Sequence, residues 1–237
     1  MPQNRRRYYR KPPPPQPGRL QIYGQAGKQL YKDVMYLKTL INSEPHYFIT
    51  NGTGNVDSLG TVLSLSEIAQ GDGPNDRTGT SVLPRFHVIN MHVNKKLTAV
   101  GTVDHETIRV IVFRYWGEQP SNPSVPTPSE ILNALNPLST LDEDNTGKRG
   151  ERERRIEVIK SKLFTLDSVA STSRTWKWNI NVNGPQKKVK EHIKWRESLG
   201  SNIPASGGFF MLMISDNASG ANKSSYGYYS KLNFYDN

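Results

Sequence analysis

The sequence contains no cysteine, which excludes disulfides, thiolate metal sites and cysteine nucleophiles. It also lacks any apolar run near the ~18 residues that a membrane-spanning helix needs. The mean hydropathy is -0.65, so we expect no membrane insertion. The N-terminus has no apolar stretch behind its first arginines, so no signal peptide is expected.

Acidic residues are missing from the first 32 positions, which carry eight Lys and Arg residues. The rest of the chain has 23 basic and 21 acidic residues, a net charge of only +2. The sequence therefore predicts two parts: a basic, proline-rich, disordered arm over residues 1–32 and a nearly neutral folded body over residues 33–237. Cationic arms of this kind bind nucleic acid or anionic surfaces.

The arm combines arginines, which pair with phosphates, and tyrosines, which stack on unpaired bases of any identity. Four successive prolines, Pro12 to Pro15, favour an extended polyproline helix. The expected nucleic-acid-binding residues are Arg5, Arg6, Arg7, Tyr8, Tyr9, Arg10, Lys11 and Arg19. The alternative is a solvated tail that serves solubility. A nuclear import signal would use the same residues and is compatible with binding.

Beyond the arm, short β-branched and aromatic runs alternate with Gly, Pro, Asn and Asp, a pattern typical of strands and turns. Long connections between such strands suggest Greek-key winding. The fold class predicted is all-β, an eight-stranded antiparallel jelly-roll sandwich. The expected strands lie near 33–50, 60–69, 82–94, 106–116, 154–166, 174–183, 208–215 and 226–235.

The run 106–116 is apolar at both odd and even positions. It is therefore expected to be buried on both faces or to lie against a neighbouring subunit. One short crossover helix is expected after Thr127, where Thr127, Pro128 and Glu130 form a capping-box pattern. The residues expected on its apolar face are Ile131, Leu132 and Leu135.

A second basic segment spans residues 187–197. Strand alternation would leave apolar side chains on its opposite face, an arrangement that suits a sheet edge touching phosphates. The basic face would consist of Lys188, Lys190, His192, Lys194 and Arg196. A solvated surface or a partly helical loop is the alternative, because Val189 and Ile193 also fit helical spacing.

The sequence carries no recognisable catalytic apparatus. His87 and His92 would point to opposite faces of a strand, and no zinc-protease, phosphate-loop or dinucleotide motif occurs. Asp72 and Asp76 could bind Ca²⁺, although a Gly/Asp/Pro/Asn turn accounts for the same residues. We therefore predict no enzyme activity, catalytic residue, cofactor or bound metal. A secreted lectin-like jelly roll and a metal-dependent jelly-roll enzyme are the alternatives from other classes.

Five short passages stand out by their order and spacing: 68–71 (Ile-Ala-Gln-Gly), 77–82 (Arg-Thr-Gly-Thr-Ser-Val), 162–166, 209–216 and 231–236. On these passages the chain resembles the single jelly-roll capsid proteins of small circular single-stranded DNA viruses and their relatives in small RNA and satellite viruses. The arm is short for this group.

The resemblance implies a structural protein of the virion that self-assembles into an icosahedral T=1 shell of about 60 copies. Its strands would be lettered B to I, with the B-I-D-G sheet facing inward. The shell would enclose a single-stranded genome, DNA in preference to RNA, and assembly would take place in the host nucleus with the host import machinery as a partner. Roughly 60 arms would supply ~480 charges against ~700 phosphates for the coat gene alone. Inward-facing residues of the body or small cations must neutralise the remainder.

Overall fold

The structure is a computed structural model, and it divides the chain into two units, Met1–Asn42 and Ser43–Asn237. It describes residues 27, 29–34, 45–95, 105–117, 125–147, 155–167, 172–183, 191–196, 202–217 and 223–236. In the first unit, residues 27 and 29–34 are helical. These helical residues overlap the end of the segment expected to be a disordered arm, and the strand expected from residue 33 begins at Pro45 instead.

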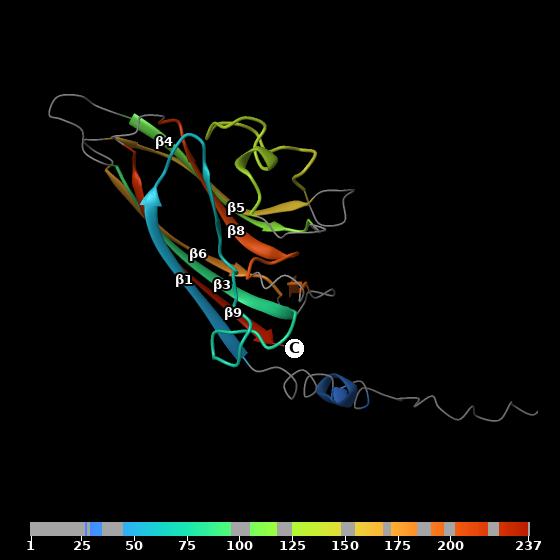
Figure 1. The fold of residues 1–237 in the computed structure, drawn as a ribbon. Helices are drawn as coiled ribbons and strands as arrows, with labels where there is room; N and C mark the ends of the chain where they lie inside the picture. The colour runs from blue at the N-terminus through green and yellow to red at the C-terminus, as the bar shows by residue number, and fades with distance from the viewer. Residues whose placement is uncertain are drawn as a thin grey trace, which may run out of the picture. The chain divides into compact units, whose positions relative to one another are not determined.

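The second unit is an antiparallel β-sandwich, which confirms the predicted fold class (Figure 1). Its strands follow the β-branched and aromatic runs of the sequence closely. They are β1 (Pro45–Asn55), β2 (Thr61–Ser64), β3 (Ser81–Asn94), β4 (His105–Tyr115), β5 (Ile156–Asp167), β6 (Ser173–Asn181), β7 (Ile193–Lys194), β8 (Gly208–Ser215) and β9 (Ser225–Asp236).

The strands form two sheets with the orders β1-β9-β3-β6 and β2-β8-β4-β5, and β7 pairs with the start of β3. When the strands other than β7 are lettered B to I along the chain, the orders become B-I-D-G and C-H-E-F. Each sheet thus alternates strands from distant parts of the sequence, as Greek-key winding produces. The two-residue β7 is a ninth strand, additional to the eight predicted, and it lies in the basic segment 187–197 for which a sheet edge was one of the two interpretations.

The main core lies between the sheets. Ile89 and Met91 of β3 and Leu232 of β9 face Val110 of β4 and Met213 of β8, and all five are buried. In β1, β3 and β9 the burial alternates, because every second side chain points away from the core. The first sheet therefore has one apolar face and one face that is open to solvent.

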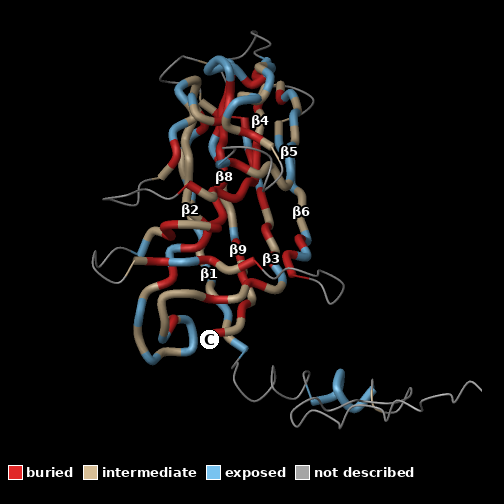
Figure 2. Tube along the Cα trace, turned by 90° about the vertical axis from the view of Figure 1, so that its right-hand side faces the viewer, coloured by how far each residue is buried: buried red, intermediate tan, exposed pale blue. Residues whose placement is uncertain are grey.

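In the second sheet, β4 and β8 are buried on both faces, whereas several side chains of β5 are exposed. A second apolar cluster packs Ile111 and Phe113 of β4 and Leu212 of β8 against Ile131 and Leu132 of the segment 125–147. Figure 1 shows this yellow-green segment beside β5 and β8, and Figure 2 shows β8 buried along its length. The double burial expected for residues 106–116 is therefore found, with the chain itself as the cover.

The crossover helix is much shorter than the sequence suggests. It is a single 3-10 turn, Pro128–Glu130, in which the Glu130 carboxylate accepts the backbone N–H of Thr127 at 2.6 Å. Ile131 and Leu132 are buried as expected, but Leu135 is 44% exposed because the helix has already ended. Within the described residues, no helix is long and apolar enough to span a membrane.

Candidate nucleic-acid interface

The predicted binding residues fall into two groups in the structure. The arm residues lie outside the described residues, so their contact with nucleic acid stays a prediction; they are Arg5, Arg6, Arg7, Tyr8, Tyr9, Arg10, Lys11 and Arg19. In the second basic segment, Lys188 and Lys190 also lie outside the described residues. His192, Lys194 and Arg196 are described and can be placed.

Residues 191–196 alternate in burial as the strand interpretation predicts. Glu191, Ile193 and Trp195 are buried, whereas Lys194 is exposed, with His192 and Arg196 intermediate. Ile193 and Lys194 pair with the first residues of β3, so this stretch is an edge addition to the first sheet rather than a helix. Its three basic side chains share one face of that edge.

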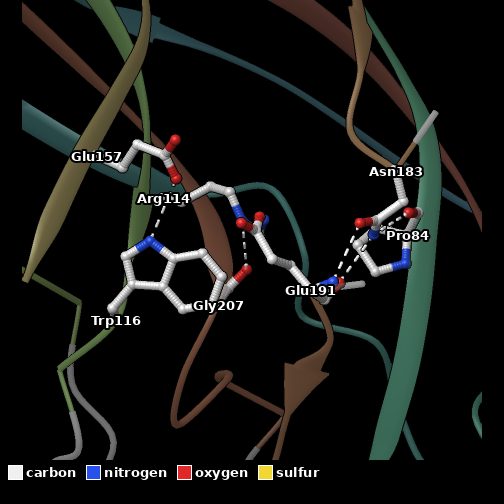
Figure 3. A network of polar contacts seen from close by, with 7 residues as sticks. All are labelled: Pro84, Arg114, Trp116, Glu157, Asn183, Glu191 and Gly207. Carbon is white, nitrogen blue, oxygen red and sulfur yellow. Dashed lines mark hydrogen bonds and ion pairs between the residues drawn. The ribbon is translucent and has the colours of Figure 1, made fainter. Parts of the chain in front are cut away.

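A buried polar network fixes this segment to the body (Figure 3). The fully buried guanidinium of Arg114 forms an ion pair with Glu191 and donates through Nε to the carbonyl of Gly207 at 3.1 Å. Asn183 donates to the carbonyls of Pro84 and Glu191 at 2.7 and 2.8 Å. Because Glu191 is tied from two sides, the basic residues that follow it are held in a defined position.

The surroundings of His192 disfavour its charged form. Burial, together with the nearby charges of Lys194 and Arg114, lowers the pKa of His192 below its ordinary value. At neutral pH this side chain therefore contributes little positive charge. The cationic character of the described segment comes from Lys194 and Arg196.

The structure adds a third and larger surface, the solvent-facing side of the first sheet. The strands β1, β3, β6 and β9 contain only one acidic residue, Asp236, and it is buried. The basic side chains on the open face are Arg85, Lys177 and Lys231, and the aromatic ones include Tyr47, Phe86, Tyr229 and Tyr235. We call this surface the open face.

The basic and aromatic groups of the open face are in contact with one another. The Lys231 ammonium lies 4.5 Å from the ring centroid of Tyr47, and the Arg85 guanidinium lies 5.1 Å from that of Tyr235. Tyr47, Phe86 and Tyr229 are each 38% exposed. Cations beside accessible rings are the elements with which proteins grip phosphates and stack bases of single strands.

A groove crosses the open face near one end of the sheet. It has a volume of about 460 Å³ and follows two cross-strand rows of side chains. One row is Thr53, Gly227, His92 and Thr175, and the other begins Asn51, Tyr229 and Asn90. The imidazole of His92 is hydrogen-bonded to the Thr175 hydroxyl at 2.7 Å.

The resemblance implied that the B-I-D-G sheet faces the interior of a shell, but the sequence analysis named none of the residues of the open face. The composition signal was present, because the four strands hold a single acid among their residues. The strand order that brings them together was not available from the residues alone. Alternation assigns a side chain to a face, but it does not say which strands are neighbours.

The arginine of the passage 77–82 has a structural role. Arg77 is buried, donates to the carbonyls of Ile68 and Gly79, and lies 4.7 Å from the centroid of Trp195. Asp236 accepts from the backbone and hydroxyl of Thr78. This passage therefore joins the end of β9 to the loop before β3, and Arg77 is not available to a phosphate.

Among the described residues, no group of three or more His, Asp or Glu side chains is placed to hold a metal ion. In the candidate Ca²⁺ loop, the Asp76 carboxylate accepts the N–H of Gly73 at 3.2 Å. The backbone N–H of Asp76 also donates to the carbonyl of Gly73, at 3.0 Å. These bonds are those of a tight turn.

Comparison with known proteins adds little. No protein-family model matches the chain, and no curated protein matches it. Among solved structures, the crystal structure of the infectious bursal disease virus VP2 subviral particle is 9% identical. The alignment covers 82% of this chain and 42% of that one, with a TM-score of 0.13. The chain therefore spans less than half the length of that VP2 chain, and a likeness this weak supports no conclusion.

Proposed function

We propose that this chain is a viral coat protein that self-assembles into a small icosahedral shell around a single-stranded DNA genome. The observation that carries the proposal is the open face, a sheet surface with basic side chains and aromatic rings and no exposed acidic residue on its four strands. Supporting it are the B-I-D-G and C-H-E-F strand orders and the arginine-rich arm. In this proposal the chain is a structural protein and not an enzyme.

The open face would act together with the arm. Arg85, Lys177 and Lys231 in about 60 copies would add roughly 180 positive charges to the ~480 of the arms. The two sources then approach the ~700 phosphates of the coat gene alone. A genome that also encodes a replication protein would still need small cations or further basic residues, such as Lys194 and Arg196.

The proposal is tested by expressing the full chain and viewing the purified protein by negative-stain electron microscopy. Uniform spheres that retain nuclease-resistant nucleic acid are expected. Extracting that nucleic acid and digesting it with DNase or RNase distinguishes a DNA cargo from the RNA cargo of a small RNA or satellite virus. A monodisperse monomer that binds glycans and no nucleic acid would instead support the lectin-like alternative.

Two variants separate the arm from the open face. Deletion of residues 1–18 should leave folding and shell formation intact while reducing the packaged nucleic acid. The double variant Lys177→Gln/Lys231→Gln should also reduce packaging with the arm still present. Lys160→Gln, at an exposed position on β5 of the other sheet, is the control, and it removes one charge where the double variant removes two. Normal packaging by the deletion variant would defeat the role assigned to the arm.

The arm would have a second use in the infected cell. Its arginine cluster has the composition of a nuclear import signal, so the full chain should accumulate in the nucleus when it is expressed in host cells. A fluorescent fusion that carries Arg5→Ala, Arg6→Ala and Arg7→Ala should remain in the cytoplasm. Equal nuclear levels of the two fusions would remove the import machinery from the partners.

A further inference from the structure

We propose that the groove on the open face is a binding site for an unpaired nucleobase, with Lys177 beside it to hold the adjoining phosphate. This inference rests on the proposed function and assigns one site within the interface. It predicts binding that depends on the bases of the strand as well as on its charge.

The groove exists because one position of its floor has no side chain. Gly227 stands on β9 between Thr53 of β1 and His92 of β3, where the alternation would otherwise place a side chain on the open face. A Cβ added there would meet a single atom within 4 Å, Thr53 Cγ2 at 3.8 Å. The fold therefore has room for a larger residue at this position.

A glycine that packing does not require is costly within a strand, because it gives up strand propensity and side-chain contacts. The nearby Gly52 and Gly54 differ in this respect, since a Cβ at either would lie within 3 Å of a tyrosine ring. Those two glycines are explained by the core. We infer that Gly227 leaves space for a ligand that approaches the open face, since glycine in a strand often marks close approach of a ligand.

The walls of the groove suit a planar heteroaromatic ring. Tyr229 and His92 present rings on which a base can stack. Asn51 and Asn90 supply amide groups that can both donate and accept hydrogen bonds. The volume of about 460 Å³ lies in the range of about 300–1,000 Å³ typical of small-ligand pockets.

The charge beside the groove indicates a nucleotide rather than a neutral sugar. Lys177 pairs across the strands with Asn90 of the groove wall, on the same face. The next lysine along β9 on this face, Lys231, lies two residues beyond Tyr229. The four strands carry no exposed acidic residue that could pair with these ammonium groups. A nucleotide whose base occupied the groove would therefore place its phosphates beside them.

The test compares two probes of equal length and charge, a thymidine 15-mer and a 15-mer of abasic residues, by fluorescence anisotropy with the full chain. Gly227→Val fills the groove with a residue that suits a strand and leaves every charge in place. We expect it to weaken binding of the thymidine 15-mer by about tenfold, the size of one base–aromatic stack. Binding of the abasic 15-mer should be unchanged.

Asn179→Val is the matched control, because Asn179 lies exposed on the same face at β6 and outside the groove. It should leave the affinity for both probes unchanged. Stacking by Tyr8 and Tyr9 of the arm cannot imitate the result, since the arm is identical in both variants. If Gly227→Val does not fold, Asn90→Ala and Tyr229→Ala should give the same selective loss.

Equal effects of Gly227→Val on the two probes, or no effect on either, would overturn the base site while leaving the coat-protein proposal intact. Failure of the wild-type chain to bind either probe at low salt would instead count against the proposed function itself. If a monosaccharide bound in the groove and thymidine oligonucleotides did not bind to the chain, both the base site and the coat-protein proposal would be overturned.

Discussion

The two sheets of the sandwich share one core, yet their outer faces differ. On β2-β8-β4-β5 the outward side chains of β4 and β8 are mostly apolar and are covered by residues 125–147. On β1-β9-β3-β6 the outward side chains are mostly polar, basic or aromatic, with a few aliphatic ones such as Ile49, and remain accessible. The outward residues of β2-β8-β4-β5 therefore stabilise the fold, whereas those of β1-β9-β3-β6 are free to bind other molecules.

The covering segment is itself held by the sheet it covers. The Arg109 guanidinium, on the outer face of β4, donates to the carbonyls of Pro137 and Ser139 and, through Nε, to the Ser161 hydroxyl at 3.2 Å. A buried apolar cluster and these polar bonds together make residues 125–147 part of the folded body. The open face has no such cover within the described part of its unit.

The sharpest difference is expected between matched truncations on the two outer faces. Phe113→Ala removes a ring that is fully buried under the covering segment and should lower the free energy of unfolding by about 3–5 kcal/mol. Tyr47→Ala, on the open face, should cost less than about 1 kcal/mol. Urea titrations followed by tryptophan fluorescence measure both values, and similar losses would show that the two faces are equivalent.

A slightly smaller effect is expected where the two sheets meet. Glu106 of β4 is buried, forms a 2.8 Å ion pair with buried Lys95, and accepts from Ser215 and Ser224. Although burial alone would raise the pKa of Glu106, these partners lower it, so the carboxylate is charged. Glu106→Gln leaves the Lys95 charge buried without its counterion and should cost about 3 kcal/mol.

Lys95→Met/Glu106→Gln is the control for that prediction. Removing the lysine charge as well should recover part of the lost stability, as measured by the same urea titrations. A double variant that is less stable than Glu106→Gln by the full cost of Lys95→Met would mean that the two groups act independently.

Most strands could be predicted because burial on one face imposes alternation on the sequence. The exceptions have local physical causes. A strand was expected from residue 33 and a disordered arm before it, but residues 29–34 are helical, and the Gln29 amide donates to the Asp33 carboxylate at i,i+4 spacing. The helix after Thr127 ends after one turn, because Asn133 bonds Thr140 and Asn136 bonds the N–H of Leu138.

The open face could not be predicted for a different reason. Tyr47 and Lys231 are 184 positions apart in the sequence, and only the placement of β9 beside β1 brings them into contact. Likewise, Gly227 looks only like an unfavourable residue within a strand in the sequence, and its place between Thr53 and His92 follows from the pairing of β9 with β1 and β3. Residue faces follow from local alternation, whereas a site built across strands requires the topology.

A third prediction concerns acid, and it involves the inner side of the first sheet. Burial lowers the pKa of His87 from 6.5 to about 3, and its ring lies edge-on to Phe209 of the second sheet at 4.9 Å. The unfolded chain therefore binds a proton between about pH 6.5 and pH 3 that the folded chain does not. Stability should fall by about 1.4 kcal/mol per pH unit through that window as the pH is lowered.

The variant His87→Leu/Ser230→Ala tests that assignment, because it removes the buried imidazole together with the hydroxyl bonded to it at 2.6 Å. Its unfolding free energy, measured from pH 7 to pH 5, should fall less steeply than that of the wild type. His192 also has a lowered pKa and contributes in the same direction in both proteins. Identical slopes for the two proteins would remove His87 as the acid-sensitive group.

The smallest effect on stability is expected where the effect on binding is clearest. Lys177→Gln/Lys231→Gln removes two ammonium groups from the open face and should change the free energy of unfolding by less than about 0.5 kcal/mol. In binding to a single-stranded oligonucleotide, each lost phosphate contact reduces the slope of log K against log salt by ~0.7, so the pair should reduce it by ~1.4. Lys160→Gln on β5 of the covered sheet should leave the slope unchanged. If Lys160→Gln reduced the slope by ~0.7, half the change of the double variant, binding would follow total charge, and the difference between the two faces would then concern stability alone.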